Sequence, residues 1–428
     1  MSTSITAAAR RRPRPLLGLA AAWLLSRALM LWLLVHDDAR PLGLGGVSRE
    51  VHHLYFHWYG ILVHGAFPVG DPMWQYPPGA GLVLLSPALL PGVTYFQGFV
   101  ALTLLTDLAV LLALLRTGLR TGRSLRGAAL WIGGLPLLLH LPLARYDVQV
   151  TAFAVLSLLA LTRSPRVCGA LAGLGALVKV WPALVLIGTP RGRDSRRAWA
   201  SAALAAAALL TLLATLFRTP FDFLRQQGGR GVQIESLGGT VLGLARRAGW
   251  PGRTRYQFGA REFVGPYVHQ VATVSLALTV LAFGLLLVWR LRARHWTTAT
   301  PSDAALAAVL LFTVTSRVIS PQYMVWLVGL AAVCLTSRHT TQRPVAWLIL
   351  AATATSTVVY PALYIEVMRS SWTGCLLMLT RNGLLACAAV LSLVRLWRAT
   401  AKRPEAVVPP REPRPGSSRL PDDRLSVS

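Results

Sequence analysis

The sequence has few of the residues that build disulfide frameworks or zinc sites. Its four cysteines lie in or beside apolar runs without the spacing of metal ligands; they are Cys168, Cys334, Cys375 and Cys387. Charged residues are also scarce, at 14%, whereas 54% of the residues are hydrophobic. The mean hydropathy is +0.52, and a soluble domain could not bury so much apolar surface. The composition therefore predicts a protein that crosses a membrane several times.

Acidic residues are the scarcest charged class. The chain has 16 Asp and Glu against 43 Lys and Arg, which gives a net charge of +27. Such an excess can indicate nucleic-acid binding. Here, however, the basic residues fall in short clusters between apolar runs, as they do in cytoplasmic loops. We therefore expect membrane lipid, and no nucleic acid, as the partner of these charges.

The two ends of the chain are expected to lie in the cytoplasm. Residues 1–15 form a basic tail, and the apolar run 16–36 has membrane length without a convincing cleavage site, as in a retained signal anchor. Residues 16–398 would form the transmembrane domain. The Pro-, Arg- and Ser-rich segment 399–428 is expected to be a disordered tail. The predicted location is the plasma membrane, with a multi-pass topology.

The apolar runs predict an all-α, polytopic fold with about 10–12 membrane segments. Gly79–Leu90 is too short to cross comfortably and is expected to be re-entrant. Trp181-Pro182 interrupts the run 169–188, whose basic flanks favour a hairpin of two half-helices. Two long outer segments remain, 37–91 and 218–267. The expected crossings are 16–36, 94–115, 127–143, 148–162, 198–217, 268–289, 304–316, 322–336, 344–365 and 374–396.

Polar residues from distant parts of the chain gather at the outer face in this topology. This is what a catalytic chamber requires, although any set of outer loops would show some of it. The first outer segment contributes the largest share of this set. The whole outer-face set is Glu50, His52, His53, Asp71, Gln75, Tyr76, Arg145, Asp147, Glu235, Ser236, Arg317, Ser320, Gln322 and Tyr323.

Four motifs resemble the polytopic bacterial glycosyltransferases of family 87. They are Trp74-Gln75-Tyr76-Pro77-Pro78, Ala144-Arg145-Tyr146-Asp147, Leu177-Val178-Lys179-Val180-Trp181-Pro182 and Ser316-Arg317-Val318-Ile319-Ser320-Pro321-Gln322-Tyr323. The resemblance implies the GT-C fold and a polyprenyl-phosphate sugar as donor. It also implies inverting transfer of a hexose or pentose, foremost mannose, to a glycolipid or glycan of the cell envelope. No cofactor is implied, and a divalent metal stays an open alternative.

Inverting transfer requires a carboxylate to accept the proton of the acceptor hydroxyl. Family members usually place an acid in the first outer loop ahead of a Trp-Tyr pair, and here Glu50 precedes Trp58 by eight residues. Glutamate in place of the more usual aspartate is a departure, and it shifts the carboxylate by about 1 Å. Asp71 is the alternative base. The competing interpretations are a surface acid beside Arg49 for Glu50, and a turn cap for Asp71.

The resemblance assigns further residues to the substrates. His53, with its neighbouring histidines, is expected to contact lipid phosphate or sugar rather than a metal, because no carboxylate has matching spacing. Arg317 is expected to bind the donor phosphate; the competing interpretation is a helix-break turn with an interfacial arginine. The other residues expected to bind substrate are Tyr55, Trp58, Tyr59, Gln75, Tyr76, Gln322 and Tyr323.

Three charged residues near the apolar runs have two interpretations each. Arg145 either forms a structural ion pair with Asp147 or binds phosphate while Asp147 orients it. Lys179 lies inside an apolar run, where an ammonium costs about 2.5–3.5 kcal/mol, so it should have an anionic or carbonyl partner. That partner would be the lipid phosphate or a group in the broken helix, unless the side chain reaches the interface.

Two other functions fit a polytopic basic chain. A lipid or glycolipid transporter would have broken helices too, but it usually has internal repeats and polar groups near the midplane, which this sequence lacks. An inactive scaffold of the same fold is the third possibility, because Glu50 stands where aspartate is usual. Substitution of Glu50 separates the scaffold from the enzyme.

Overall fold

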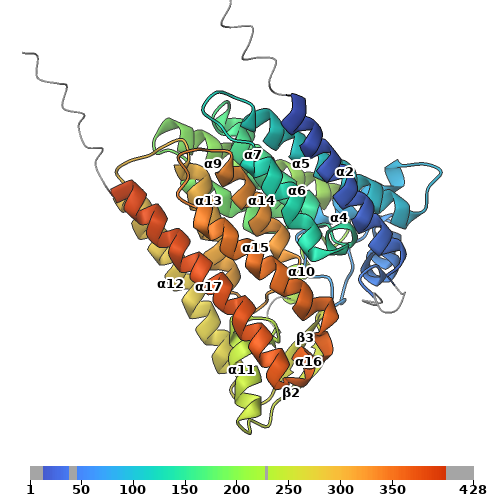
Figure 1. Cartoon of the computed structure of the whole chain (residues 1–428). Coiled ribbons are helices and arrows are strands. Elements are labelled where there is room, and N and C mark those ends of the chain that lie inside the picture. Colours follow the sequence, from blue (N-terminus) through green and yellow to red (C-terminus); the bar gives the residue numbers. More distant parts are fainter. Residues whose placement is uncertain (1–12, 38–45, 227–229, 402–428) are drawn as a thin grey trace, which may run out of the picture.

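The computed structural model describes residues 13–37, 46–226 and 230–401. Most of both predicted tails lies outside these residues. The described chain is mostly helical and forms one bundle (Figure 1), as expected for a polytopic membrane protein. The start of α2 and the end of α17 lie toward the upper end of the bundle in that view. The strands, α11 and α16 lie at the opposite end.

Within the described residues, six helices are long and apolar enough to cross a membrane. They are α2 (Pro13–Val35), α5 (Tyr95–Gly118), α9 (Arg193–Leu216), α12 (Val268–Arg292), α17 (Trp372–Ala401), and α15 (Arg343–Thr357) together with the turn η6 (Val358–Ala362) that continues it. Shorter apolar helices complete the bundle; they are α4 (Gly79–Leu85), α6 (Arg126–Gly134), α7 (Asp147–Ala160), α8 (Pro165–Val178), α13 (Thr300–Thr315) and α14 (Tyr323–Leu335). The predicted multi-pass helical fold is therefore confirmed.

Helix α14 is the centre of the bundle. All of its residues from Met324 to Cys334 are buried, and a helix that is apolar on every side belongs in a core. It contacts α6, α7, α13 and α15. The predicted crossing 127–143 is interrupted, because α6 gives way to two short 3-10 turns, η3 (Leu135–Leu138) and η4 (Leu141–Ala144), each with a proline in its first turn.

The run 169–188 folds as a hairpin, in agreement with the sequence. Helix α8 ends before Lys179, which is extended, and the 3-10 helix η5 (Trp181–Gly188) follows. Gly169 faces Ala198 and Gly173 faces Ala202, so α8 and α9 pack closely and in parallel. The first residues of α9 therefore lie beside the first residues of α8, and the segment with η5 must lead the chain from the end of α8 back to that side. The guanidinium of Arg290 donates to the carbonyls of Ile187 and Thr189, and this fixes the returning end.

The long segment 218–267 contains structure that the sequence did not predict. Besides α10 (Phe223–Gln226) and α11 (Leu237–Arg247), it forms an antiparallel sheet of β1 (Val232–Gln233), β2 (Arg253–Gln257) and β3 (Ala260–Val264), in the order β1-β3-β2. Phe258 and Gly259 both have positive φ, the geometry of a two-residue hairpin turn. Arg381 of α17 pairs with Glu235 at 3.1 Å and holds this segment on the bundle.

The first outer segment is a packed unit rather than an open loop. It contains η1 (Glu50–Tyr55), α3 (Phe56–Leu62), α4 and η2 (Ser86–Leu89). The rings of Trp58 and Trp74 meet edge to face at 5.1 Å, and both are buried. A Cβ on Gly79 would lie 2.6 Å from the carbonyl oxygen of Leu177, so glycine allows α4 to touch the end of α8. The aromatic segment is thereby placed against the helix break at Lys179.

Candidate active site

A polar cavity of about 240 Å³ lies where the first outer segment, the α8–η5 break, the β2–β3 turn and the start of α14 meet. A larger groove elsewhere has an almost wholly apolar lining, so the polar cavity is the better place for chemistry. The cavity brings together residues separated by most of the chain length. Those predicted from the sequence as site residues are Glu50, Gln75, Tyr76, Lys179, Gln322 and Tyr323.

The ammonium of Lys179 is enclosed by a carboxylate and aromatic rings. Its Nζ lies 2.6 Å from Oδ1 of Asp147, which also accepts a hydrogen bond of 2.6 Å from the indole of Trp326. The ring centroids of Tyr146 and Trp326 lie 4.7 Å and 5.2 Å from Nζ, and that of Tyr76 lies 5.8 Å away. Cation–π attraction and the ion pair together offset the cost of burying the charge.

Glu50 faces the cavity and has a cationic partner. Its Oε2 lies 3.5 Å from Nη2 of Arg145, and its side chain remains 29% exposed. The Nη1 of Arg145 donates to the carbonyls of Val47 and Ala144, which fixes the guanidinium behind the cavity wall. The pairing of Arg145 with Asp147 considered from the sequence is therefore not formed. Arg145 is extended and α7 begins at Asp147, so their side chains reach different partners.

Asp71 does not line the cavity. One carboxylate oxygen accepts a 2.8 Å hydrogen bond from the indole of Trp58, and the other accepts one of 2.8 Å from the backbone N–H of Met73. These are the contacts of a turn residue that also anchors an aromatic side chain. Of the two candidate bases, Glu50 and Asp71, only Glu50 therefore lines the cavity.

Several predicted substrate contacts lie behind or beside the cavity rather than on its lining. Tyr55 and Trp58 are fully buried in aromatic packing. Tyr59 packs on Tyr95 at 4.9 Å, and His53 is exposed outside the cavity lining. Their described contacts shape the wall that carries Glu50. Burial raises the pKa of Tyr76, so its phenol stays neutral and able to donate a hydrogen bond.

A second cavity of about 700 Å³ adjoins the first and shares Arg230 and Phe312 with it. Its lining includes Arg230, Arg255 and Arg317, together with apolar and polar residues of the first half of α12. The Arg317 guanidinium donates to the carbonyl of Arg230 at 3.0 Å. The sequence pointed to Arg317, but Arg230 was one arginine among many in its loop, and no local signal singled it out.

No group of three or more His, Cys, Asp or Glu residues that could hold a metal ion occurs in the part of the chain that the structure describes. The cavity residues instead combine one partly exposed carboxylate, two cations and several aromatic rings. Such a set suits a polar ligand with an anionic group.

The fold and cavity define a multi-pass membrane protein with a charged chamber at one end of its helical bundle. A model of glycosyltransferase family 87 matches residues 74–321, more than half of the chain, and the chain belongs to this family of membrane glycosyltransferases. The resemblance noted in the sequence is thereby confirmed. No curated protein and no solved structure matches the chain. Glu50, Gln322 and Tyr323 line the cavity from outside the matched residues.

Proposed function

We propose that this glycosyltransferase moves a hexose or pentose, with mannose as the first sugar to test, from a polyprenyl-phosphate donor to a cell-envelope glycolipid or glycan. Transfer inverts the anomeric centre and occurs at the outer face of the plasma membrane, with both termini in the cytoplasm. One observation carries the proposal. Glu50 lines the same polar cavity as Lys179 and Arg230, and this cavity adjoins a second one lined in part by the long apolar helix α12.

Glu50 is the proposed general base. Its carboxylate accepts the proton of the acceptor hydroxyl while that oxygen bonds to the anomeric carbon of the donor sugar. The bond between the anomeric carbon and the phosphate oxygen breaks, and polyprenyl phosphate leaves with the electron pair. Arg145, 3.5 Å from Glu50, orients the carboxylate before the reaction.

The donor phosphate is assigned to Arg230 and Arg317, which line the second cavity. Arg230 borders both cavities, and Arg317 lies beside it. Positive charge there stabilises the phosphate as it leaves. The isoprenoid chain would follow the wall made by Ala272 and Leu276 of α12, a helix whose apolar face is largely exposed.

The aromatic side of the cavity is assigned to the sugar. Tyr323 and Trp326 stack at 3.9 Å, and Trp181 stacks on Trp326 at 5.1 Å. Trp181 and Trp326 are buried behind the partly exposed Tyr323, whose ring offers a flat apolar surface, while Gln322 and Tyr76 supply polar groups for sugar hydroxyls. Lys179 holds the arrangement through Asp147, and it lies on the cavity wall where it also meets the donor.

The test is sugar transfer by the purified protein in lipid vesicles. Radiolabelled polyprenyl-phosphate mannose and polyprenyl-phosphate arabinose are supplied separately, with extracted envelope lipids as acceptors. The proposal expects label in an acceptor product from one donor, and about 10²–10⁴-fold slower labelling with Glu50→Gln. Transfer that survives both Glu50→Gln and Asp71→Asn would refute the carboxylate mechanism. Absence of transfer with folded protein, together with movement of labelled lipid across the vesicle membrane, would favour a transporter.

A further inference from the structure

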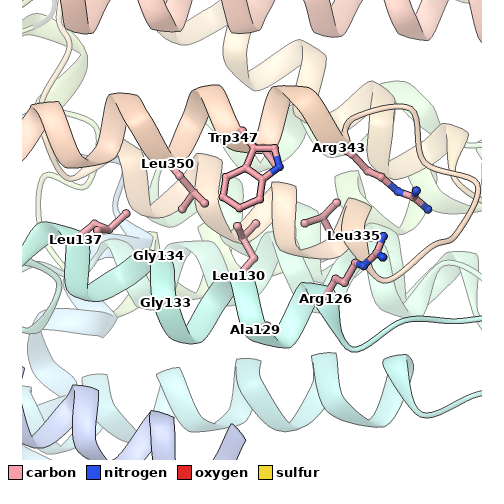
Figure 2. Close-up of a pocket in the computed structure, with 11 residues that line it drawn as sticks. Arg126, Ala129, Leu130, Gly133, Gly134, Leu137, Leu335, Arg343, Trp347 and Leu350 are labelled. Atoms are coloured by element: carbon pink, nitrogen blue, oxygen red, sulfur yellow. The ribbon is translucent and has the colours of Figure 1, made fainter. Parts of the chain in front are cut away.

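A groove of about 570 Å³ lies between α6 and α15, away from the candidate active site (Figure 2). Leu130 and Leu137 line one side, and Trp347 and Leu350 line the other. The rest of the lining is also apolar, apart from two arginines at one end. Neither the proposed transfer reaction nor its two cavities uses this groove.

The groove opens on the outer surface of the bundle. Trp347 is 73% exposed, although its indole borders the groove. Gly133 is also exposed, and a Cβ built on it would meet nothing within 4 Å, so open space lies above it. Gly134 instead packs against Val328 of α14 and closes the floor. An exposed apolar groove on a membrane helix bundle is a place where a lipid chain can lie.

Arg126 and Arg343 mark one end of the groove, and Figure 2 shows both guanidinium groups at that end. Among the residues that the structure describes, no acidic side chain lines the groove. A basic hollow with Arg338 continues from the same two arginines. The guanidinium of Arg343 donates to the carbonyl of Arg338 at 3.0 Å, which orders this end.

The arginines lie at the membrane boundary opposite to the candidate active site. Helix α5 starts beside the first outer segment, where Phe96 stacks on His52 at 4.0 Å. Its other end leads directly into α6, which begins at Arg126. Likewise, α14 starts at the polar cavity and leads into α15, which begins at Arg343. Because α5 is long and apolar enough to cross a membrane, we expect both arginines at the headgroup level of the side opposite to the polar cavity.

We propose that this groove binds an anionic phospholipid, whose phosphate lies between Arg126 and Arg343 while one acyl chain lies over Gly133 against Trp347. Charge complementarity decides the occupant. A zwitterionic lipid carries a quaternary ammonium beside its phosphate, which the two arginines would repel, and a second copy of this face would bring four arginines together. Basic pockets between membrane helices are known to favour acidic headgroups.

The experiment compares binding of dioleoyl phosphatidylglycerol and dioleoyl phosphatidylcholine to the full-length protein in an uncharged detergent, by native mass spectrometry. The proposal expects phosphatidylglycerol to bind at least roughly tenfold more tightly. The double variant Arg126→Gln/Arg343→Gln should lose this preference. Gly133→Phe should reduce phosphatidylglycerol binding, because its ring fills the open space.

Two matched controls separate this groove from general effects of charge and bulk. Arg292→Gln removes an exposed arginine outside the groove, at the last residue of α12. Gly284→Phe adds a ring on α12, at a glycine where a Cβ also meets nothing within 4 Å. Both should keep the preference for phosphatidylglycerol. Equal binding of the two lipids by the native protein would overturn the proposal. A preference for phosphatidylglycerol that survives in both groove variants would also overturn it, as would an equal loss of this preference in the two controls. A dimer of the protein that only the groove variants dissociate would show that a second copy occupies the groove instead.

Discussion

The ammonium of Lys179 and the carboxylate of Asp147 form an ion pair of 2.6 Å in which Asp147 is 1% exposed. The two residues come from the break after α8 and from the first turn of α7. The pair therefore joins the hairpin to the core at the floor of the polar cavity. Trp326 of α14 donates to the same carboxylate oxygen, so three helical segments meet at one atom.

Removing one member of this pair should be strongly destabilising. Lys179→Met leaves the buried carboxyl group of Asp147 without its cation, a change that typically costs about 3–5 kcal/mol. The double variant Lys179→Met/Asp147→Asn removes both charges and should recover a large part of the loss. Thermal unfolding of the purified protein in one detergent measures both. Equal melting temperatures for Lys179→Met and the native protein would contradict the buried ion pair.

Glu50→Gln should lower sugar transfer by about 10²–10⁴-fold, the usual contribution of a general base. The melting temperature should change little, because the side chain is 29% exposed and its ion pair with Arg145 is long, at 3.5 Å. Glu50→Asp should retain part of the activity, since the carboxylate is kept but withdrawn by one methylene. Initial rates at saturating donor give the comparison.

Asp71→Asn provides the matched control for that experiment. Its carboxylate holds Trp58 and the backbone of Met73, so its loss should lower stability by about 1–3 kcal/mol. Turnover per folded molecule should stay within a few-fold of the native value. A loss of turnover as deep as that of Glu50→Gln, with an unchanged melting temperature, would move the base to Asp71.

Arg230→Gln should weaken donor use more than acceptor use. Arg230 borders both cavities, where its charge can reach the donor phosphate, and its Nε lies 3.7 Å from the buried carboxylate of Glu262. We expect KM for the donor to rise about tenfold, which corresponds to about 1.4 kcal/mol. Arg253→Gln, on the exposed face of β2 and outside both cavities, should leave KM unchanged. Equal effects of the two variants would argue against a specific phosphate contact.

The parts of the fold that follow from local pattern were predictable. Apolar run length gave the helices, and Trp181-Pro182 with its basic flanks gave the hairpin. Family motifs led to Lys179, Gln322 and Tyr323, which all line the cavity. In each case the determining residues are close together in the sequence.

The pairing of charges could not be predicted in the same way. Arg145 and Asp147 are two residues apart, yet Arg145 pairs with Glu50 and Asp147 pairs with Lys179. Both pairings depend on how segments distant in the sequence pack together. The burial of Trp58 likewise depends on Trp74 and Asp71 across a folded segment. Sequence chemistry identified these side chains as important, but tertiary packing decides which of them reach open space.

Asp37 shows a further contact that the sequence did not reveal. Its Oδ1 lies 2.7 Å from Nε2 of His140, and its Oδ2 accepts hydrogen bonds from the backbone and hydroxyl of Ser48. Burial by itself would raise the pKa of Asp37, but these hydrogen bonds outweigh it and lower the pKa to about 2. The end of α2 is thus tied both to the first outer segment and to the turn before η4.

Because the pKa of Asp37 is lower in the folded state than its ordinary value of 3.8, the ionised carboxylate stabilises the fold above about pH 4. This contribution should disappear as the pH falls toward 2, since the folded state then binds the proton as well. Asp37→Asn should therefore melt at a lower temperature than the native protein at pH 6. This difference in melting temperature, the gap, should narrow between pH 4 and pH 2. Asp194→Asn, an exposed acid in the first turn of α9, should show a small gap throughout. A gap for Asp37→Asn that stays constant down to pH 2 would mean that ionisation of Asp37 does not stabilise the fold.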